Sequence, residues 1–221
     1  MTRRWGFLQL TLFIAAWMLL APLLRDRWIV QVALQAFLLN VTLVTLHANP
    51  EWRGARRAVI GLWVLALAGS IIALAPLPER AQHIARSAEV VSSLPLIALL
   101  CIGILRYVFR RRELTIDGIF ATIAVYLLVG LLFSLVYLLL LEWNPASFNL
   151  PPERLAQGPA LVQSAMLYYS MITLATVGYG DILPLTDTAR SLAVLEATVG
   201  QFYVAVIVAV FVGMFSTQRH K

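Results

Sequence analysis

The sequence predicts an all-α membrane protein with six transmembrane helices and one shorter, re-entrant helix. Of its 221 residues, 61% are hydrophobic and only 13% are charged. An ordinary globular domain has about 45–50% apolar and about 25% charged residues. A single water-soluble core therefore cannot hold this apolar surface, and lipid is the expected solvent. Six apolar runs are long enough to cross a bilayer, and we expect spans at residues 5–24, 28–47, 58–77, 89–109, 117–141 and 189–215.

The distribution of charge predicts the orientation of these spans. The net charge is +6, but the arginines lie in short loops and form no basic face, so nucleic acid is not an expected partner. With six spans, 11 cations fall on the side of the two termini and 5 on the other side, with Arg190 at its edge. Cytoplasmic loops of membrane proteins carry an excess of Lys and Arg. We therefore expect an integral protein of the plasma (inner) membrane with both termini in the cytoplasm.

One short segment, residues 176–181, carries the functional prediction. It reads Thr-Val-Gly-Tyr-Gly-Asp and follows an apolar run at 160–175 that is too short to span. Backbone carbonyls replace the water around an ion if they all point inward, and Gly178 and Gly180 permit the positive φ that this requires. Thr176 can add its hydroxyl. Two nearby glycines alone would indicate a turn, but the flanking helical runs favour an ion-binding strand.

With these surroundings, the motif resembles the pore of the tetrameric potassium-channel family, whose filter contains TVGYG. The resemblance covers roughly the last half of the chain. It implies that carbonyls of Thr176, Val177, Gly178 and Tyr179 coordinate the transported K⁺, with no cofactor. The side chains of Val177 and Tyr179 would point outward into the packing around the strand. One chain carries one such strand, so a ring needs several copies, and the family makes that number four.

The resemblance also implies residues that support the filter. These are Gly180 and Asp181, together with Tyr168 and Tyr169, where the family commonly has two tryptophans. By analogy with the family's aromatic–aspartate contact, Tyr168 is expected to reach Asp181. Some relatives have a glutamate four residues before the filter threonine, and here that position is Ile172.

The last span holds the predicted inner pore and gate. Gly200 lies nineteen residues after Asp181, the spacing of a hinge glycine in many relatives; a hinge and close helix packing are both open. Glu196 is a carboxyl inside the membrane, which usually has a partner or a role. Ser170 and Thr173 are its candidate partners, and either a structural hydrogen bond or proton-sensitive gating would explain it. Helical spacing predicts that four further residues line the inner pore, where the valines would close it by dewetting: Gln201, Val204, Val208 and Val212.

The domain prediction follows the layout of six spans. Residues 1–109 form a four-helix membrane domain, 110–116 a cytoplasmic linker and 117–221 the pore domain. The pore domain divides into outer helix 117–142, turret 143–159, pore helix 160–175, filter 176–181 and inner helix 189–215. A voltage sensor needs arginines at every third position of the fourth span, and residues 89–105 have none. Little or no voltage dependence is expected.

A cluster of cations follows the fourth span. It consists of Arg106, Arg110, Arg111 and Arg112, which either attract anionic lipids or simply anchor the topology. Only six residues follow Phe215, so the cytoplasmic ligand-binding domain of many prokaryotic relatives is not expected within this sequence.

The predicted function is passive, potassium-selective conduction. A weakly selective cation channel is the runner-up. A potassium transporter subunit would carry four filter repeats, and this chain has one. An enzyme is not expected, because the first four spans contain no paired carboxylates, metal cluster or nucleophile arrangement.

Overall fold

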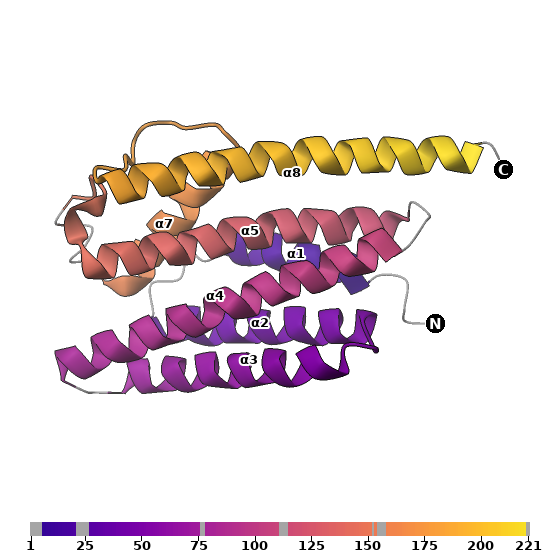
Figure 1. The fold of residues 1–221 in the computed structure, drawn as a ribbon. Coiled ribbons are helices and arrows are strands. Elements are labelled where there is room, and N and C mark those ends of the chain that lie inside the picture. Colours follow the sequence, from indigo (N-terminus) through magenta and orange to yellow (C-terminus); the bar gives the residue numbers. More distant parts are fainter. Residues whose placement is uncertain are drawn as a thin grey trace.

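A computed structural model describes residues 6–20, 27–75, 78–110, 115–151, 153 and 158–219. Long helices laid side by side make up almost all of this part of the chain (Figure 1). Within it there is no strand, and one isolated bridge joins Phe148 to Pro184. The elements are α1 (Gly6–Leu20), α2 (Arg27–Ala48), α3 (Arg53–Leu74), α4 (Glu79–Arg110), α5 (Ile116–Trp143), the short 3₁₀ helix η2 (Pro145–Ser147), α7 (Pro159–Leu174) and α8 (Asp187–Arg219).

The helices fit a membrane protein, and the all-α prediction is confirmed at this level. Five described helices, α2, α3, α4, α5 and α8, are long and apolar enough to cross a membrane. The first predicted span is the exception. Its described part, α1, has 15 residues, about 22 Å at 1.5 Å per residue, against a hydrocarbon core of about 30 Å. The rest of that expected span lies outside the described residues, so the six-span layout is not confirmed.

Helix boundaries depart most from the prediction at the start of α4. The apolar run begins at residue 89, but the helix already begins at Glu79. The carbonyl of Pro78 accepts hydrogen bonds from the N–H groups of Ala81 and Gln82, at 2.9 and 3.1 Å, and so starts the first turn. Hydropathy finds where a helix becomes apolar, whereas the helix itself begins wherever its first hydrogen bonds can close.

The N-terminal helices share one hydrophobic core with the pore helices. Buried side chains run continuously from Phe7 in α1 through α2 and α4 to Leu167 in α7. α1 lies directly on α5: the N–H of Phe7 donates to Asp117 at 3.0 Å, and the Thr11 hydroxyl lies 2.8 Å from the carbonyl oxygen of Phe120. α3 packs on α4, and α4 packs on α5 (Figure 1). The pore helices are therefore held from behind by residues far away in the sequence.

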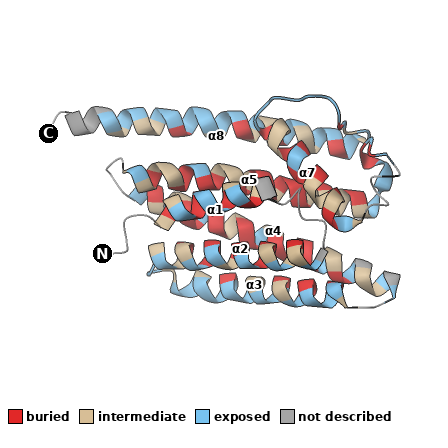
Figure 2. Ribbon diagram, turned by 180° about the vertical axis from the view of Figure 1, so that it is seen from behind, coloured by how far each residue is buried: buried red, intermediate tan, exposed pale blue. Residues whose placement is uncertain are grey.

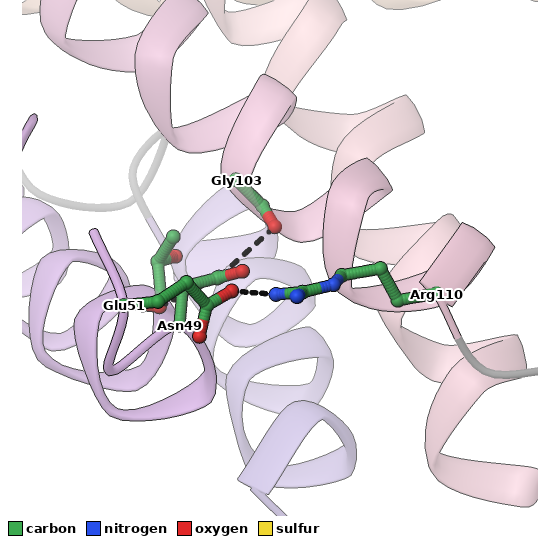
Figure 3. Close-up of polar contacts among 5 residues, drawn as sticks. Asn49, Glu51, Gly103 and Arg110 are labelled. Atoms are coloured by element: carbon green, nitrogen blue, oxygen red, sulfur yellow. Dashed lines mark hydrogen bonds and ion pairs between the residues drawn. The ribbon is translucent and has the colours of Figure 1, made fainter.

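The turn between α2 and α3 is fastened to α4 (Figure 3). The buried amide of Asn49 donates to the carbonyl oxygens of Thr45 and Gly103, each at 3.0 Å. Gly103 lies so close that an added Cβ would stand 2.6 Å from the Thr45 side chain. Glu51 forms an ion pair with Arg110 at the end of α4. Of the cations in the predicted lipid-binding cluster, Arg106 and Arg110 are both exposed, and the other two lie outside the described residues.

α8 stands apart from the other helices. The described start of α1 and the described end of α8 lie at one end of the bundle, and α7 lies at the other (Figure 1). Figure 2 shows α8 mostly exposed along its length. Only 11% of its most apolar stretch is buried, against 50% for α5. Most of the surface of α8 is therefore available to something outside this chain.

Candidate functional site

The helix before the motif is held between the two pore helices. α7 runs from Pro159 to Leu174, within one residue of the prediction at each end. Gly158 precedes it with φ +104°, and Pro159 occupies the first turn, where its missing N–H is not needed. α7 packs against both α5 and α8. Its 16 residues extend about 24 Å, too short to cross a bilayer. It therefore delivers the chain part of the way across and turns into the motif.

The N–H groups of the motif turn back onto α7. Those of Thr176, Val177 and Gly178 donate to carbonyl oxygens in the last turn of the helix, at 2.9, 2.8 and 3.3 Å. These bonds satisfy carbonyls that a helix end otherwise leaves unpaired. No donor in the described part of the chain reaches the carbonyl oxygens of residues 176–179. The first three residues of the strand thus have their N–H donors paired, while the carbonyl oxygens of residues 176–179 stay open, which suits a cation.

The backbone of the motif changes handedness at every second residue. φ is positive at Thr176 (+57°), Gly178 (+55°) and Gly180 (+79°). This alternation turns successive peptide groups the same way, whereas successive groups in an ordinary strand point to opposite sides. The two glycines adopt the predicted conformation. Thr176 was not expected to do so: a β-branched residue at positive φ is an outlier that costs about 1–3 kcal/mol. Such strain is typical of functional sites.

The inner end of the motif touches α8. The side-chain amide of Gln201 donates to the hydroxyl oxygen of Thr176 at 3.1 Å. Both residues were predicted as parts of the pore, but the contact between them was not. It places the first residue of the motif at the level of the middle of α8.

The outer end of the motif is held from two sides. The hydroxyl of Tyr168 lies beside the Asp181 carboxylate and interacts with it, so Tyr168 reaches Asp181 as the sequence predicted. On the other side, Asn149 acts like a paired strand residue: its side-chain oxygen accepts from the N–H of Leu183 at 2.6 Å, and its amide donates to the Asp181 carbonyl at 3.4 Å. Asn149 was missed. An asparagine beside prolines in a loop was the available signal, since its side chain pairs with backbone.

The two adjacent tyrosines point in different directions. Tyr168 turns to the motif and is 39% exposed in this chain, whereas Tyr169 is buried. The Tyr169 ring stands edge-on to Tyr137 of α5 and to Phe148, each with centroids 5.1 Å apart. This edge-to-face packing joins α5, α7 and the turret segment. The pair therefore supports the motif in two ways: Tyr168 interacts with Asp181, and Tyr169 packs between α5 and the turret segment.

Glu196 lies where three helices meet. It is fully buried, and its carboxyl contacts the hydroxyl of Tyr137 in α5 at 2.6 Å and the hydroxyl of Ser170 in α7. Ser170 is one of the two predicted partners. The prediction of the other, Thr173, is wrong: it lies about one turn further along α7, and its hydroxyl donates to the carbonyl of Tyr169 in the same helix at 2.8 Å. Tyr137 was missed, although a tyrosine inside a leucine-rich run is itself a signal.

Two glycines allow the helices to approach closely. A Cβ on Gly200 would stand 2.3 Å from the carbonyl oxygen of Leu174, so α8 touches the end of α7 at this point. A Cβ on Gly130 of α5 would stand 2.2 Å from the tip of Met171. The structure thus supports the packing explanation for Gly200, while its role as a hinge stays a prediction.

Several predicted pore residues are exposed in the single chain. Val177 is 51% and Tyr179 is 71% exposed, so this chain does not supply the packing that was expected around their side chains. The reason is that the strand lies on the surface of the subunit. The four predicted inner-pore residues of α8 are exposed as well: Gln201, Val204, Val208 and Val212.

Comparison with known proteins agrees with the position of this site. The model of a family described as "Ion channel" matches residues 154–217, which include α7, the motif and most of α8. Protein LctB of Bacillus caldotenax is 33% identical over 96 residues, which cover 43% of this chain and 71% of that protein. Protein LctB of Geobacillus stearothermophilus is 32% identical over 96 residues, with the same coverage. No solved structure matches the chain.

Proposed function

Because this chain belongs to the ion channel family, we propose that it conducts potassium ions selectively through a filter formed by Thr176–Asp181. One observation carries this proposal. The motif combines positive φ at every second residue with carbonyl oxygens that accept no hydrogen bond from the described residues. Peptide oxygens aimed to one side can replace the hydration shell of K⁺. The ion would be held by carbonyls of Thr176, Val177, Gly178 and Tyr179.

The assembly we propose is a homotetramer. A ring of carbonyls needs several strands, and each chain brings one. The exposed motif and the exposed surface of α8 support this, because both would be covered by neighbouring copies around a central axis. We propose a plasma-membrane location with cytoplasmic termini, since the excess of cations favours that side.

Conduction should depend little on voltage. The arginines of α4 are Arg80, Arg86, Arg106 and Arg110, and residues 90–105 between them contain no charged side chain that could move through the field. We propose that Arg106 and Arg110 interact with anionic lipid head groups. This would add to the ion pair that Arg110 makes with Glu51.

The test is ion flux through the full chain reconstituted in liposomes. We expect K⁺ flux to exceed Na⁺ flux strongly and to vary little with membrane potential. In Gly178→Ala, a Cβ at φ +55° costs about 1–2 kcal/mol in each copy and should abolish selective K⁺ flux. Gly61→Ala is the matched control, because nothing in the structure lies near its added methyl group.

Two results would contradict the proposal. Equal Na⁺ and K⁺ flux would favour the runner-up, a weakly selective cation channel. Unchanged K⁺ selectivity in Gly178→Ala would separate conduction from this motif altogether. Native mass spectrometry of the same preparation should give four copies.

A further inference from the structure

The buried junction at Glu196 has more hydrogen-bond acceptors than hydrogens. The hydroxyl oxygen of Ser170 lies 2.6 Å from the carbonyl oxygen of Gly130 and also contacts Oε1 of Glu196. The hydroxyl of Tyr137 lies 2.6 Å from Oε2 of the same carboxyl. These are three close oxygen–oxygen contacts. The serine and the tyrosine supply one hydrogen each, so an ionised Glu196 would leave one contact without a hydrogen.

A proton on Glu196 closes this network. Glu196 then donates from Oε1 to the hydroxyl oxygen of Ser170, and Ser170 donates to the carbonyl of Gly130. Tyr137 donates to Oε2. Every contact has one donor and one acceptor, and no hydrogen is shared.

Among the residues that the structure describes, no cationic side chain pairs with Glu196. The titratable side chains that interact with Glu196 are Tyr126 and Tyr137 from α5 and Tyr169 from α7. A tyrosine is neutral when protonated and negative when ionised, so none of the three can supply a positive charge. None of the ion pairs among the described residues includes Glu196. A buried carboxylate without a cation is expensive in the membrane. Charge and hydrogen-bond geometry therefore agree.

We propose that Glu196 is a neutral carboxylic acid whose proton fastens α8 to α7 behind the filter. Glu196 contacts α5 and α7 and not the filter strand, so it is a positioning residue. It acts through Ser170, which precedes the first filter residue Thr176 by less than two helical turns. One turn further along α8, Gly200 contacts the end of α7 at Leu174. Loss of the proton removes the hydrogen from the Ser170 contact and places an unpaired charge at this junction.

Infrared spectroscopy of the full chain in liposomes tests the protonation directly. The difference spectrum between the wild type and Glu196→Gln should show the carbonyl band of a protonated carboxylic acid at neutral pH. That band should disappear as the pH rises. A carboxylate band at neutral pH in its place would overturn the proposal. This measurement does not depend on conduction, so it separates a failure here from a failure of the proposed function.

Flux measurements test the positioning role, which rests on the proposed potassium channel. The amide of Glu196→Gln can donate to Ser170 and accept from Tyr137, so this variant should keep K⁺ selectivity at neutral pH. The wild type should lose selectivity at alkaline pH, whereas Glu196→Gln should keep it. Coinciding pH profiles of the two proteins, or lost selectivity of the variant at neutral pH, would overturn the proposal.

A serine pair provides the second test and its control. Ser170→Ala removes the acceptor for the Glu196 proton and should reduce K⁺ selectivity several-fold. Ser134→Ala should leave selectivity unchanged, because the hydroxyl of that buried serine of α5 bonds, among the described residues, to the carbonyl of Leu131 in its own helix, at 2.7 Å. Equal selectivity in the two variants would show that the junction does not position the filter.

Discussion

α5 and α8 are both long apolar helices next to the candidate filter, yet their surroundings differ. Half of the most apolar stretch of α5 is buried, because α1, α4 and α7 of the same chain cover it. Only 11% of the corresponding stretch of α8 is buried. The buried residues of α8 include Glu196, Gly200 and Ile207, and more than half of the described helix up to Phe215 is exposed. Similar composition thus serves two tasks: α5 completes the core of one subunit, and α8 presents surface to lipid, water or other copies.

Gly200 tests the narrow contact that α8 does make. In Gly200→Ala, the new methyl group would stand 2.3 Å from a backbone oxygen of α7, which cannot move away cheaply. We expect loss of the folded tetramer, or at least of all K⁺ flux. Gly213→Ala in the same helix has nothing near its methyl group and should behave as the wild type. Size-exclusion chromatography and flux measure both variants.

The behaviour of Gly200→Ala also distinguishes the two explanations for Gly200, close helix packing and a hinge. If Gly200→Ala assembled with wild-type thermal stability and changed only how often the pore opens, the glycine would act as a hinge. The close contact with Leu174 would then be unimportant for folding.

The exposed faces of α8 should differ in access to water. Val208 and Val206 are similarly exposed, at 55% and 51%, but lie on different sides of the helix. Val206 borders an apolar groove shared with Leu105 and Phe109 of α4, whereas Val208 falls in the row proposed to line the pore. A charged thiol reagent applied from the cytoplasmic side should block K⁺ current in Val208→Cys and leave Val206→Cys unaffected.

The parent chain is the control for this labelling, since its single cysteine, Cys101, is buried. Block of Val206→Cys with Val208→Cys spared would reverse the orientation of α8 in the tetramer.

The hydrogen bonds of Asn49 belong to the part of the molecule whose contacts are made within a single chain, in contrast to α8. Its buried amide joins α2 to the carbonyl of Gly103 in α4. Asn49→Ala leaves that buried carbonyl without this donor, which should lower stability by about 1–3 kcal/mol. Thermal unfolding in detergent measures the change. An unchanged midpoint would mean that water or lipid reaches this turn and replaces the lost hydrogen bond.

The sequence predicted the backbone conformation of the motif better than it predicted the side-chain hydrogen bonds between helices around it. The positive φ at Gly178 and Gly180 followed from the motif, because the chemistry of carbonyl coordination demands it and only glycine adopts it freely. The bonds from Gln201 to Thr176 and from Tyr137 to Glu196 join residues 25 and 59 positions apart. Such pairs depend on how helices pack, which local pattern does not encode.

Helix ends and helix faces account for the remaining errors. The polar first turns of α4 are helical although they carry no hydropathy signal, since Glu79–Ser87 contains residues that form helices well. Thr173 and Ser170 lie on the same face of α7, one turn apart, and only the level at which α8 crosses α7 decides that Ser170 contacts Glu196.

The ion pair between Glu51 and Arg110 should have the smallest effect, although it lies beside Asn49 (Figure 3). Its side chains are 39% and 56% exposed, so water screens the attraction. Exposed pairs contribute about 0–1 kcal/mol, and Glu51→Gln should therefore shift thermal unfolding less than Asn49→Ala does. Higher salt should reduce the difference in thermal unfolding between the wild type and Glu51→Gln. A loss as large as that of Asn49→Ala would show that the assembled protein or its lipids bury this pair. The turn between α2 and α3 would then depend, like α8, on surroundings outside the single chain.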